Sequence, residues 1–229
     1  RDVDGRTCLQ YACSSGDLDT VKTIIGKCVG KGSKIKGINT RDNDGYTPLM
    51  YGVWKMHFDV VNYLLQNGAD IYAQASYGNT ALMLACENND VDMVELFLSR
   101  KDMNIEARDR DGRTALIHAA YDGHFEVLRL LVEMGNADIE ANTGKMKNGS
   151  ITTPLLQAAY WGHLDICKFL VGKGANILEK VSASKTAESV ATANGHLDTA
   201  AYFRRLVKEQ RAKLVLEKQY WEEKQADGL

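Results

Sequence analysis

Residues 111–124 read Asp-Gly-Arg-Thr-Ala-Leu-Ile-His-Ala-Ala-Tyr-Asp-Gly-His, and this order of residue types returns along the chain. Residues 44–49 read Asp-Gly-Tyr-Thr-Pro-Leu, and residues 153–163 read Thr-Pro-Leu-Leu-Gln-Ala-Ala-Tyr-Trp-Gly-His. The threonine that opens the pattern occurs at Thr7, Thr47, Thr80, Thr114, Thr153 and Thr186, at intervals of 40, 33, 34, 39 and 33 residues. A unit that recurs at this spacing indicates a repeat architecture, with insertions in the two longer intervals.

Each copy carries the local signals of two short helices. The threonine hydroxyl can cap the first helix, and Pro48 and Pro154 stand one residue later, where a missing N–H costs nothing. Small pairs such as Ala119-Ala120 allow neighbouring copies to pack closely, and leucine pairs mark the second helix. Glycines at Gly68, Gly135 and Gly174 follow that second helix, where a left-handed residue is expected to end it.

The order Gly-x-Thr-Pro-Leu-x-x-Ala-Ala-x-x-Gly-His, followed by Leu-Leu-x-x-Gly-Ala-Asp, resembles the ankyrin repeat. The resemblance covers residues 2 to about 203 and implies an all-α ankyrin-repeat solenoid of stacked helix-turn-helix units with β-hairpin fingers. Six copies are expected, at about 2–41, 42–74, 75–108, 109–147, 148–180 and 181–203, within a repeat domain at 1–203.

Several positions depart from the family pattern. Met56 and Asn89 stand where a glycine between the two helices is usual. The family's asparagine before the finger, a hydroxylation target in some members, survives only as Asn39, and the other copies hold Tyr72, Glu106, Glu140 and Leu178. Extensive hydroxylation is therefore not expected.

Three segments lie outside the repeat consensus. The insertions at 26–37 and 142–151 carry lysines and glycines, and both are interpreted as surface loops or as functional extensions. Residues 204–226 contain neither Gly nor Pro, and Val207, Leu214 and Trp221 recur every seven residues. A C-terminal amphipathic helix is therefore predicted at 204–229, either as a cap folded back over the stack or as a docking helix for a partner.

Composition excludes several classes of protein. The net charge of −2 gives no reason to expect nucleic acid, and no run of 18 apolar residues predicts a membrane helix. Five irregularly spaced cysteines indicate buried free thiols rather than a disulfide framework, which favours the cytoplasm, or the nucleus. The chain is expected to be monomeric, and its start at Arg1 suggests part of a longer protein.

The sequence offers no constellation typical of an enzyme, so we expect no catalytic residue, no metal site and no cofactor. His57, His124, His163 and His196 occupy one slot in successive copies, so they are too far apart to share a metal. Each is interpreted as a turn histidine that bonds to the backbone, and His118 as a packed residue. The finger aspartates are interpreted as turn formers.

The resemblance implies a concave face, formed by the fingers and the first helices, that binds a protein or peptide. Exposed aromatic and arginine side chains often dominate such interfaces. The candidate partner-binding residues are Tyr46, Trp54, Lys55, Tyr77, Asn79, Arg110, Arg113, Tyr121, Tyr160 and Trp161. Two functions follow: a non-catalytic interaction module or scaffold, or the regulatory ankyrin module of a larger enzyme or channel. Packing of some rings against the next finger is the alternative to binding.

Overall fold

A computed structural model of the chain describes residues 1–28, 37–100, 103–144, 151–178 and 186–226, with side chains to residue 218 in the last segment. Within these ranges the regular structure is twelve α-helices and no strand. The first helices of the six copies are α1 Cys8–Ser15, α3 Pro48–Trp54, α5 Ala81–Glu87, α7 Ala115–Asp122, α9 Pro154–Trp161 and α11 Ala187–Ala193. The second helices are α2 Leu18–Cys28, α4 Phe58–Gln66, α6 Val91–Leu98, α8 Phe125–Glu133, α10 Leu164–Gly172 and α12 Leu197–Ala226.

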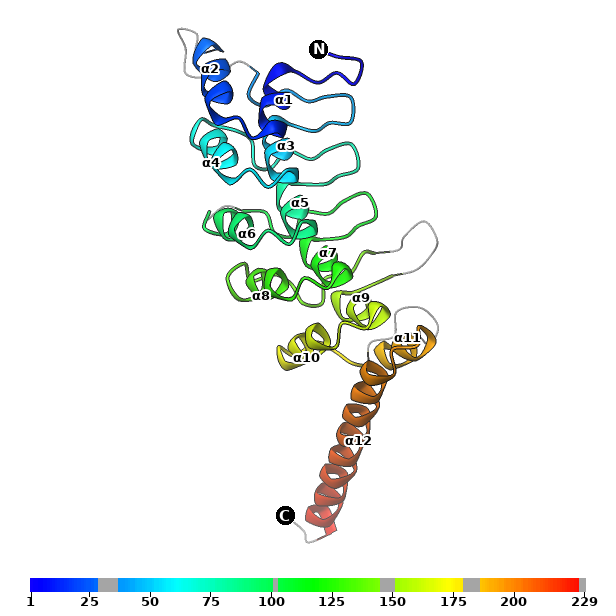
Figure 1. Ribbon diagram of the computed structural model, residues 1–229. Helices are drawn as coiled ribbons and strands as arrows, with labels where there is room; N and C mark the ends of the chain where they lie inside the picture. The colour runs from blue at the N-terminus through cyan, green and yellow to red at the C-terminus, as the bar shows by residue number, and fades with distance from the viewer. Residues whose placement is uncertain (29–36, 101–102, 145–150, 179–185, 227–229) are drawn as a thin grey trace.

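The twelve described helices form a stack two helices deep. First helices contact one another from α1 to α11 in one column, and second helices form the other column (Figure 1). Alanine at the facing positions allows this close stacking, since Ala119, Ala120, Ala158 and Ala159 are all fully buried. The core runs the length of the stack, as expected for a solenoid in which each copy contacts only its neighbours.

The predicted helix starts are confirmed. All six threonines are N-cap residues, and in five of them the hydroxyl accepts a hydrogen bond from the backbone N–H three residues later. Thr114 is the exception, because its buried hydroxyl has no hydrogen-bond partner. Pro48 and Pro154 are the first residues of α3 and α9.

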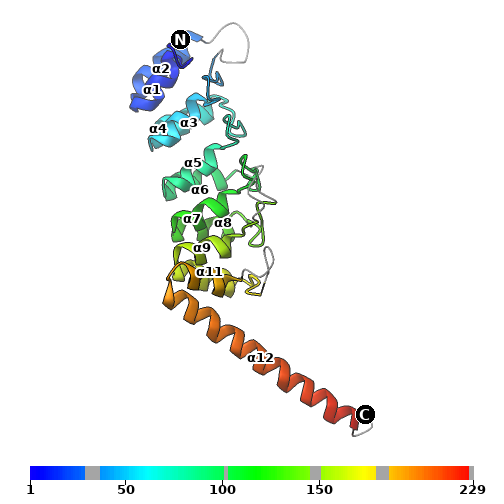
Figure 2. The ribbon, with the colours of Figure 1, turned by 90° about the vertical axis from the view of Figure 1, so that its right-hand side faces the viewer.

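The fingers are tight hairpin turns that project from the column of first helices (Figures 1 and 2). In the second copy the N–H of Asp42 donates to the carbonyl of Tyr46 at 3.1 Å, and equivalent pairs close three further fingers. Neighbouring fingers are joined too: the N–H of Ser76 donates to the carbonyl of Asp44 at 2.7 Å, and that of Arg110 to Tyr77 at 2.8 Å. These bonds hold the fingers in register without forming a strand in the described residues.

Left-handed backbone occurs at the turns, although not always at glycine. Met56 and Asn89 have φ of 59° and 55°, which is the conformation that glycine adopts in the same turn of other copies. The second helix ends at a left-handed Gly68 and Gly174, as expected. The expectation for Gly135 is wrong: the left-handed residue there is Asn136, with φ of 59°, because asparagine tolerates this region.

Helix α12 is both the second helix of the sixth copy and an extension beyond the stack. Ala200 and Phe203 are buried against the stack, and Leu206 and Val207 pack at its edge. Every side chain from 208 to 218 is exposed, and the helix points away from the stack (Figure 2). This part of α12 extends beyond the last copy instead of lying over its end. Leu214, Val215 and Leu216 are consecutive, so they face different sides of the helix.

Some sequence-based expectations fall on residues that the structure does not describe. Most of the insertion at 26–37 lies at 29–36, and that at 142–151 contains 145–150. The side chain of Trp221 also lies outside the described residues.

Candidate partner-binding face

The ten candidate residues lie on the fingers and the first helices, and they divide into three parts along the stack. Tyr46, Trp54 and Lys55 belong to the second copy. Tyr77, Asn79, Arg110 and Arg113 lie on the fingers of the third and fourth copies. Tyr121, Tyr160 and Trp161 are at the C-terminal ends of α7 and α9.

The first part is an aromatic cluster formed by α3 and the finger that precedes it. The ring centroids of Tyr46 and Tyr51 are 6.0 Å apart, and those of Tyr51 and Trp54 are 6.3 Å apart. Tyr51 is buried and Tyr46 half-buried, whereas Trp54 is half exposed. The Lys55 Nζ lies 4.4 Å from the centroid of the Trp54 ring, so the exposed ring carries a cation of the protein's own.

The third part is a second aromatic cluster, which joins the fourth and fifth copies. Trp161 is in edge contact with Tyr121 at 5.1 Å and with Tyr160 at 5.2 Å between ring centroids. The lateral packing of rings is therefore real here, but all three rings remain exposed over more than a third of their surface. The guanidinium of Arg113 lies 5.7 Å from the centre of the Tyr121 ring.

Between the two clusters lies a polar pocket of about 320 Å³. We call it the central pocket, and its lining residues are Tyr77, Asn79, Glu87, Asp109, Arg110, Asp111, Arg113 and His118. The Arg110 guanidinium lies 5.3 Å from the centre of the exposed Tyr77 ring. Four of the ten candidate residues therefore converge on one pocket, which the sequence analysis did not predict.

His118, on α7, is one of the residues that line the central pocket. Its Nε2 lies 3.0 Å from Oδ2 of Asp109, and its Nδ1 lies 3.2 Å from Oε1 of Glu87. Its side chain is only 9% exposed, so the prediction that it is packed is confirmed. The two ring nitrogens face one carboxylate each, and the contacts link the finger of the fourth copy with α5 of the third.

The two carboxyl groups beside His118 have opposite pKa shifts. Burial raises the pKa of Glu87; His118 opposes this, while the negative charges of Asp122 and Asp109 add to it. Burial alone would also raise the pKa of Asp109, but the hydrogen bonds from His118 and from the backbone N–H groups of Arg113 and Asp111 leave it lowered. Asp109 is thus a stabilised carboxylate, whereas Glu87 is a poorly solvated one.

A signal for Glu87 was present in the sequence. The residue seven positions after the opening threonine is Trp54 in the second copy, Glu87 in the third, Tyr121 in the fourth and Tyr160 in the fifth. Glu87 is therefore the one carboxylate in an otherwise aromatic row.

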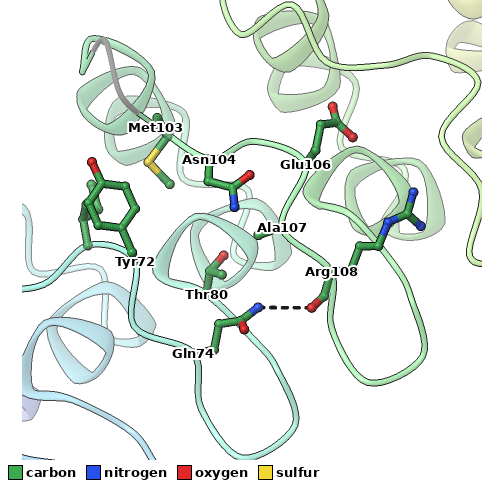
Figure 3. Close-up of a pocket in the computed structure, with 9 residues that line it drawn as sticks. Tyr72, Gln74, Thr80, Met103, Asn104, Glu106, Ala107 and Arg108 are labelled. Atoms are coloured by element: carbon green, nitrogen blue, oxygen red, sulfur yellow. Dashed lines mark hydrogen bonds between the residues drawn. The ribbon is translucent and has the colours of Figure 1, made fainter.

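A second pocket, of about 380 Å³, lies between the stems of the third and fourth fingers (Figure 3). In other copies a side-chain oxygen in this slot accepts a hydrogen bond from a backbone N–H of the next copy: Asn39 from Asp70, Glu106 from Asp138 and Glu140 from Asn176. Tyr72 fills the slot here with a phenol ring. None of the ten candidate residues lines this pocket.

Three of the four turn histidines bond to backbone carbonyls, as predicted, whereas the ring of His196 makes no such bond among the described residues. His57 Nε2 lies 3.1 Å from the carbonyl oxygen of Ser14, His124 Nδ1 lies 2.8 Å from that of Cys86, and His163 Nε2 lies 3.2 Å from that of Tyr121. Each bond joins a copy to the one before it. In the described part of the chain, no group of three or more His, Cys, Asp or Glu side chains is placed to hold a metal ion.

The described thiols are mostly buried. Burial raises the pKa of Cys13 and Cys167 to about 12, so both remain thiols at neutral pH. The expectation of burial is wrong for Cys8, which is exposed, and the side chain of Cys28 is not described. None of the helices in the described ranges is long and apolar enough to cross a membrane.

The stacked helix pairs, the protruding fingers and the histidine turns define a helical repeat protein of the interaction class. The ankyrin-repeat family in its three-copy form matches residues 1–75 and 73–143, and its many-copy form matches residues 147–204. The chain belongs to the ankyrin-repeat family. Ankyrin repeats indicate a protein–protein interaction module.

Relatives and a solved structure agree with this assignment. The crystal structure of the ankyrin repeat domain of Bcl-3 superimposes with a TM-score of 0.76 and 29% identity, covering 88% of this chain and 86% of that one. "Probable 26S proteasome regulatory subunit p28" of Saccharomyces cerevisiae is 29% identical over 139 residues, which are 61% of this chain and 59% of the relative. The E3 ubiquitin-protein ligase XBAT33 of Arabidopsis thaliana is 33% identical over 126 residues, covering 54% of this chain and 23% of that protein. The chain thus spans less than two thirds of each curated relative.

Proposed function

We propose that the chain is a non-catalytic module that binds a partner protein or peptide on its concave face, across the second to fifth copies. The observation that carries the proposal is the row of exposed aromatic side chains on that face. Trp54, Tyr121, Tyr160 and Trp161 keep between 37% and 50% of their surface in contact with water. Aromatic rings in this position gain free energy when a partner covers them.

The neighbouring cations support the same proposal. Lys55, Arg110 and Arg113 each lie over an aromatic ring, which holds the long side chain in place before any partner arrives. A side chain that is already ordered loses less conformational entropy on binding. The face therefore offers a preorganised surface of rings and charges.

The experiment is an affinity pull-down with the wild-type chain and with the double variant Trp54→Ala, Tyr121→Ala. We expect specific partners to be lost from the double variant while its circular dichroism spectrum stays native, since neither residue is fully buried. A matched control is Tyr63→Ala on the second-helix column, which should retain the partners. Undiminished capture by a natively folded double variant would contradict the proposal.

A second candidate is a regulatory ankyrin module within a larger enzyme or channel. It is supported by the coverage of the relatives, because the chain matches 23% of the length of a ubiquitin ligase. The sequence of the full-length gene product tests it: a catalytic or channel-forming domain beside the repeats would support this alternative. We further propose a monomeric chain in the cytoplasm or nucleus that needs no cofactor and binds no nucleic acid.

A further inference from the structure

The central pocket has more carboxylates than it can satisfy internally. Asp109 is fully engaged, since Oδ1 accepts from two backbone N–H groups and Oδ2 contacts His118. Glu87 is not, because Oε1 contacts His118 while Oε2 has no hydrogen-bond partner among the described residues. Asp111 lines the same pocket, with one carboxylate oxygen 3.8 Å from Arg113.

Both arginines of the pocket contact groups of the protein itself. Arg110 lies over Tyr77, and Arg113 lies over Tyr121 and beside Asp111, although the buried Nε of Arg113 has no hydrogen-bond partner among the described residues. An acidic guest would have to displace these contacts and would meet the charges of Glu87 and Asp111. An apolar guest would remove the remaining water from Glu87 without replacing its hydrogen bonds, which is costly for a charged group.

A cationic guest meets neither obstacle. Its positive charge would compensate the carboxylate of Glu87. The negative charge of Asp122 on α7 also acts on this carboxyl group and raises its pKa. The ring of Tyr46 is close enough to Glu87 for that carboxylate to influence its ionisation. Trp54 and Tyr121 occupy the same slot on the two flanking helices. Those two rings already carry Lys55 and Arg113, so the attraction for an ammonium or guanidinium group comes from the carboxylate of Glu87.

We propose that the central pocket between α5 and α7 receives one arginine or lysine side chain of the partner, with the carboxylate of Glu87 as its ion-pair acceptor. This inference rests on the proposed function, because the basic side chain belongs to the peptide that docks on the concave face. A volume of about 320 Å³ is at the lower end of ligand pockets and suits a single long side chain.

The test is a selection of phage-displayed random peptides, performed in parallel on the wild-type chain and on Glu87→Gln. We expect wild-type binders to share one basic residue at a fixed position, and we expect that preference to disappear with Glu87→Gln. Glutamine keeps the shape of the side chain and can still accept from His118. Glu95→Gln, which alters an exposed carboxylate on α6, is the matched control and should leave the preference intact.

A synthetic copy of the selected peptide, with its basic residue replaced by citrulline, tests the pairing without relying on a folded variant alone. Affinity for the wild type should fall about tenfold, the lower end of what a hydrogen bond to a charged group contributes. Affinity for Glu87→Gln should hardly change, since the two replacements remove the same interaction.

The failures of the two proposals can be told apart. Peptides that lack a shared basic residue, but lose binding in the Trp54→Ala, Tyr121→Ala variant, would overturn this inference and leave the proposed function standing. Peptides that bind that double variant as well as the wild type, or a selection that yields no binder, would overturn both.

Discussion

His118 Nε2 lies 3.0 Å from Oδ2 of Asp109, and the contact ties the first helix of the fourth copy to its own finger. The same link, at the same spacing of nine residues, occurs in two other copies. The hydroxyl of Tyr11 donates to Asp2 and that of Tyr51 donates to Asp42, each at 2.6 Å. In all three copies the other oxygen of the finger aspartate accepts from two backbone N–H groups. The finger is thus held both within its turn and against its helix.

The variant Tyr51→Phe measures how much this hydrogen bond contributes to the stability of the fold. The change removes the hydroxyl that donates to Asp42 and leaves the buried ring in place, so we expect a loss of about 1 kcal/mol in the free energy of unfolding. Urea titration followed by circular dichroism measures it. Tyr63→Phe is the control, because the Tyr63 hydroxyl makes no hydrogen bond in the described structure. Equal stability of Tyr51→Phe and wild type would show that the link contributes nothing.

The lowered pKa of Asp109 predicts a dependence of stability on pH. Because the folded-state pKa lies below the ordinary value of 3.8, ionised Asp109 stabilises the fold at higher pH. This contribution is lost as the pH falls from the ordinary value through the folded-state pKa. Asp109→Asn should therefore be less stable than wild type at neutral pH, and the difference should shrink in acid. Urea midpoints across this pH range measure it, and a difference independent of pH would contradict the assignment.

The raised pKa of Glu87 predicts the opposite dependence of stability on pH. Its folded-state pKa is raised, so its contribution to stability is present below the ordinary value of 4.5 and is lost as the pH rises through the folded-state pKa. Glu87→Gln should therefore gain stability relative to wild type on going from acid to neutral pH. The same urea titrations measure it. A variant that loses stability over this interval would show that the ionised carboxylate is better satisfied than its contacts indicate.

The left-handed turn residues give a further prediction. Met56 has φ of 59° and an exposed side chain, so Met56→Gly removes backbone strain without opening a cavity. We expect the free energy of unfolding to rise by about 1 kcal/mol. The relieved strain stabilises the folded state, and the greater entropy of glycine in the unfolded chain offsets part of this gain. Asn89→Gly is the matched comparison and should gain less, because asparagine tolerates this conformation. Thermal unfolding of both variants compares their stabilities. A larger gain in stability for Asn89→Gly than for Met56→Gly would contradict the assignment of greater strain to Met56.

The repeat fold could be predicted from sequence because its signals are local. A threonine, a proline one residue later and a pair of alanines each act within one helix or between adjacent copies. The position of Pro48 and the burial of Ala119 follow from such rules. The exposure of Cys8 did not follow from them, because rules that act within one copy do not set how much of a side chain the surrounding structure covers.

The central pocket could not be predicted in the same way. It forms where Glu87 on α5 meets His118 on α7, and these residues belong to different copies. Aligning the copies shows that Glu87 interrupts the aromatic row, but the alignment does not show which side chain it faces. The pairing of His118 with Asp109 depends likewise on how the finger bends back to its helix. Sequence periodicity shows which residues occupy equivalent positions in the copies. Which of those residues contact one another is decided only by the folded structure.

The exposed part of α12 gives the last prediction. Truncation after Val207 removes side chains that are exposed from 208 to 218, while Phe203 remains fully buried. We expect the free energy of unfolding of the stack to change by less than about 0.5 kcal/mol, as for other exposed positions, while the helical signal falls. Phe203→Ala is the contrasting control and should cost about 3–5 kcal/mol, because it removes a buried ring. Urea titration measures both. A truncated chain as unstable as Phe203→Ala would mean that the distal helix packs on the stack in solution.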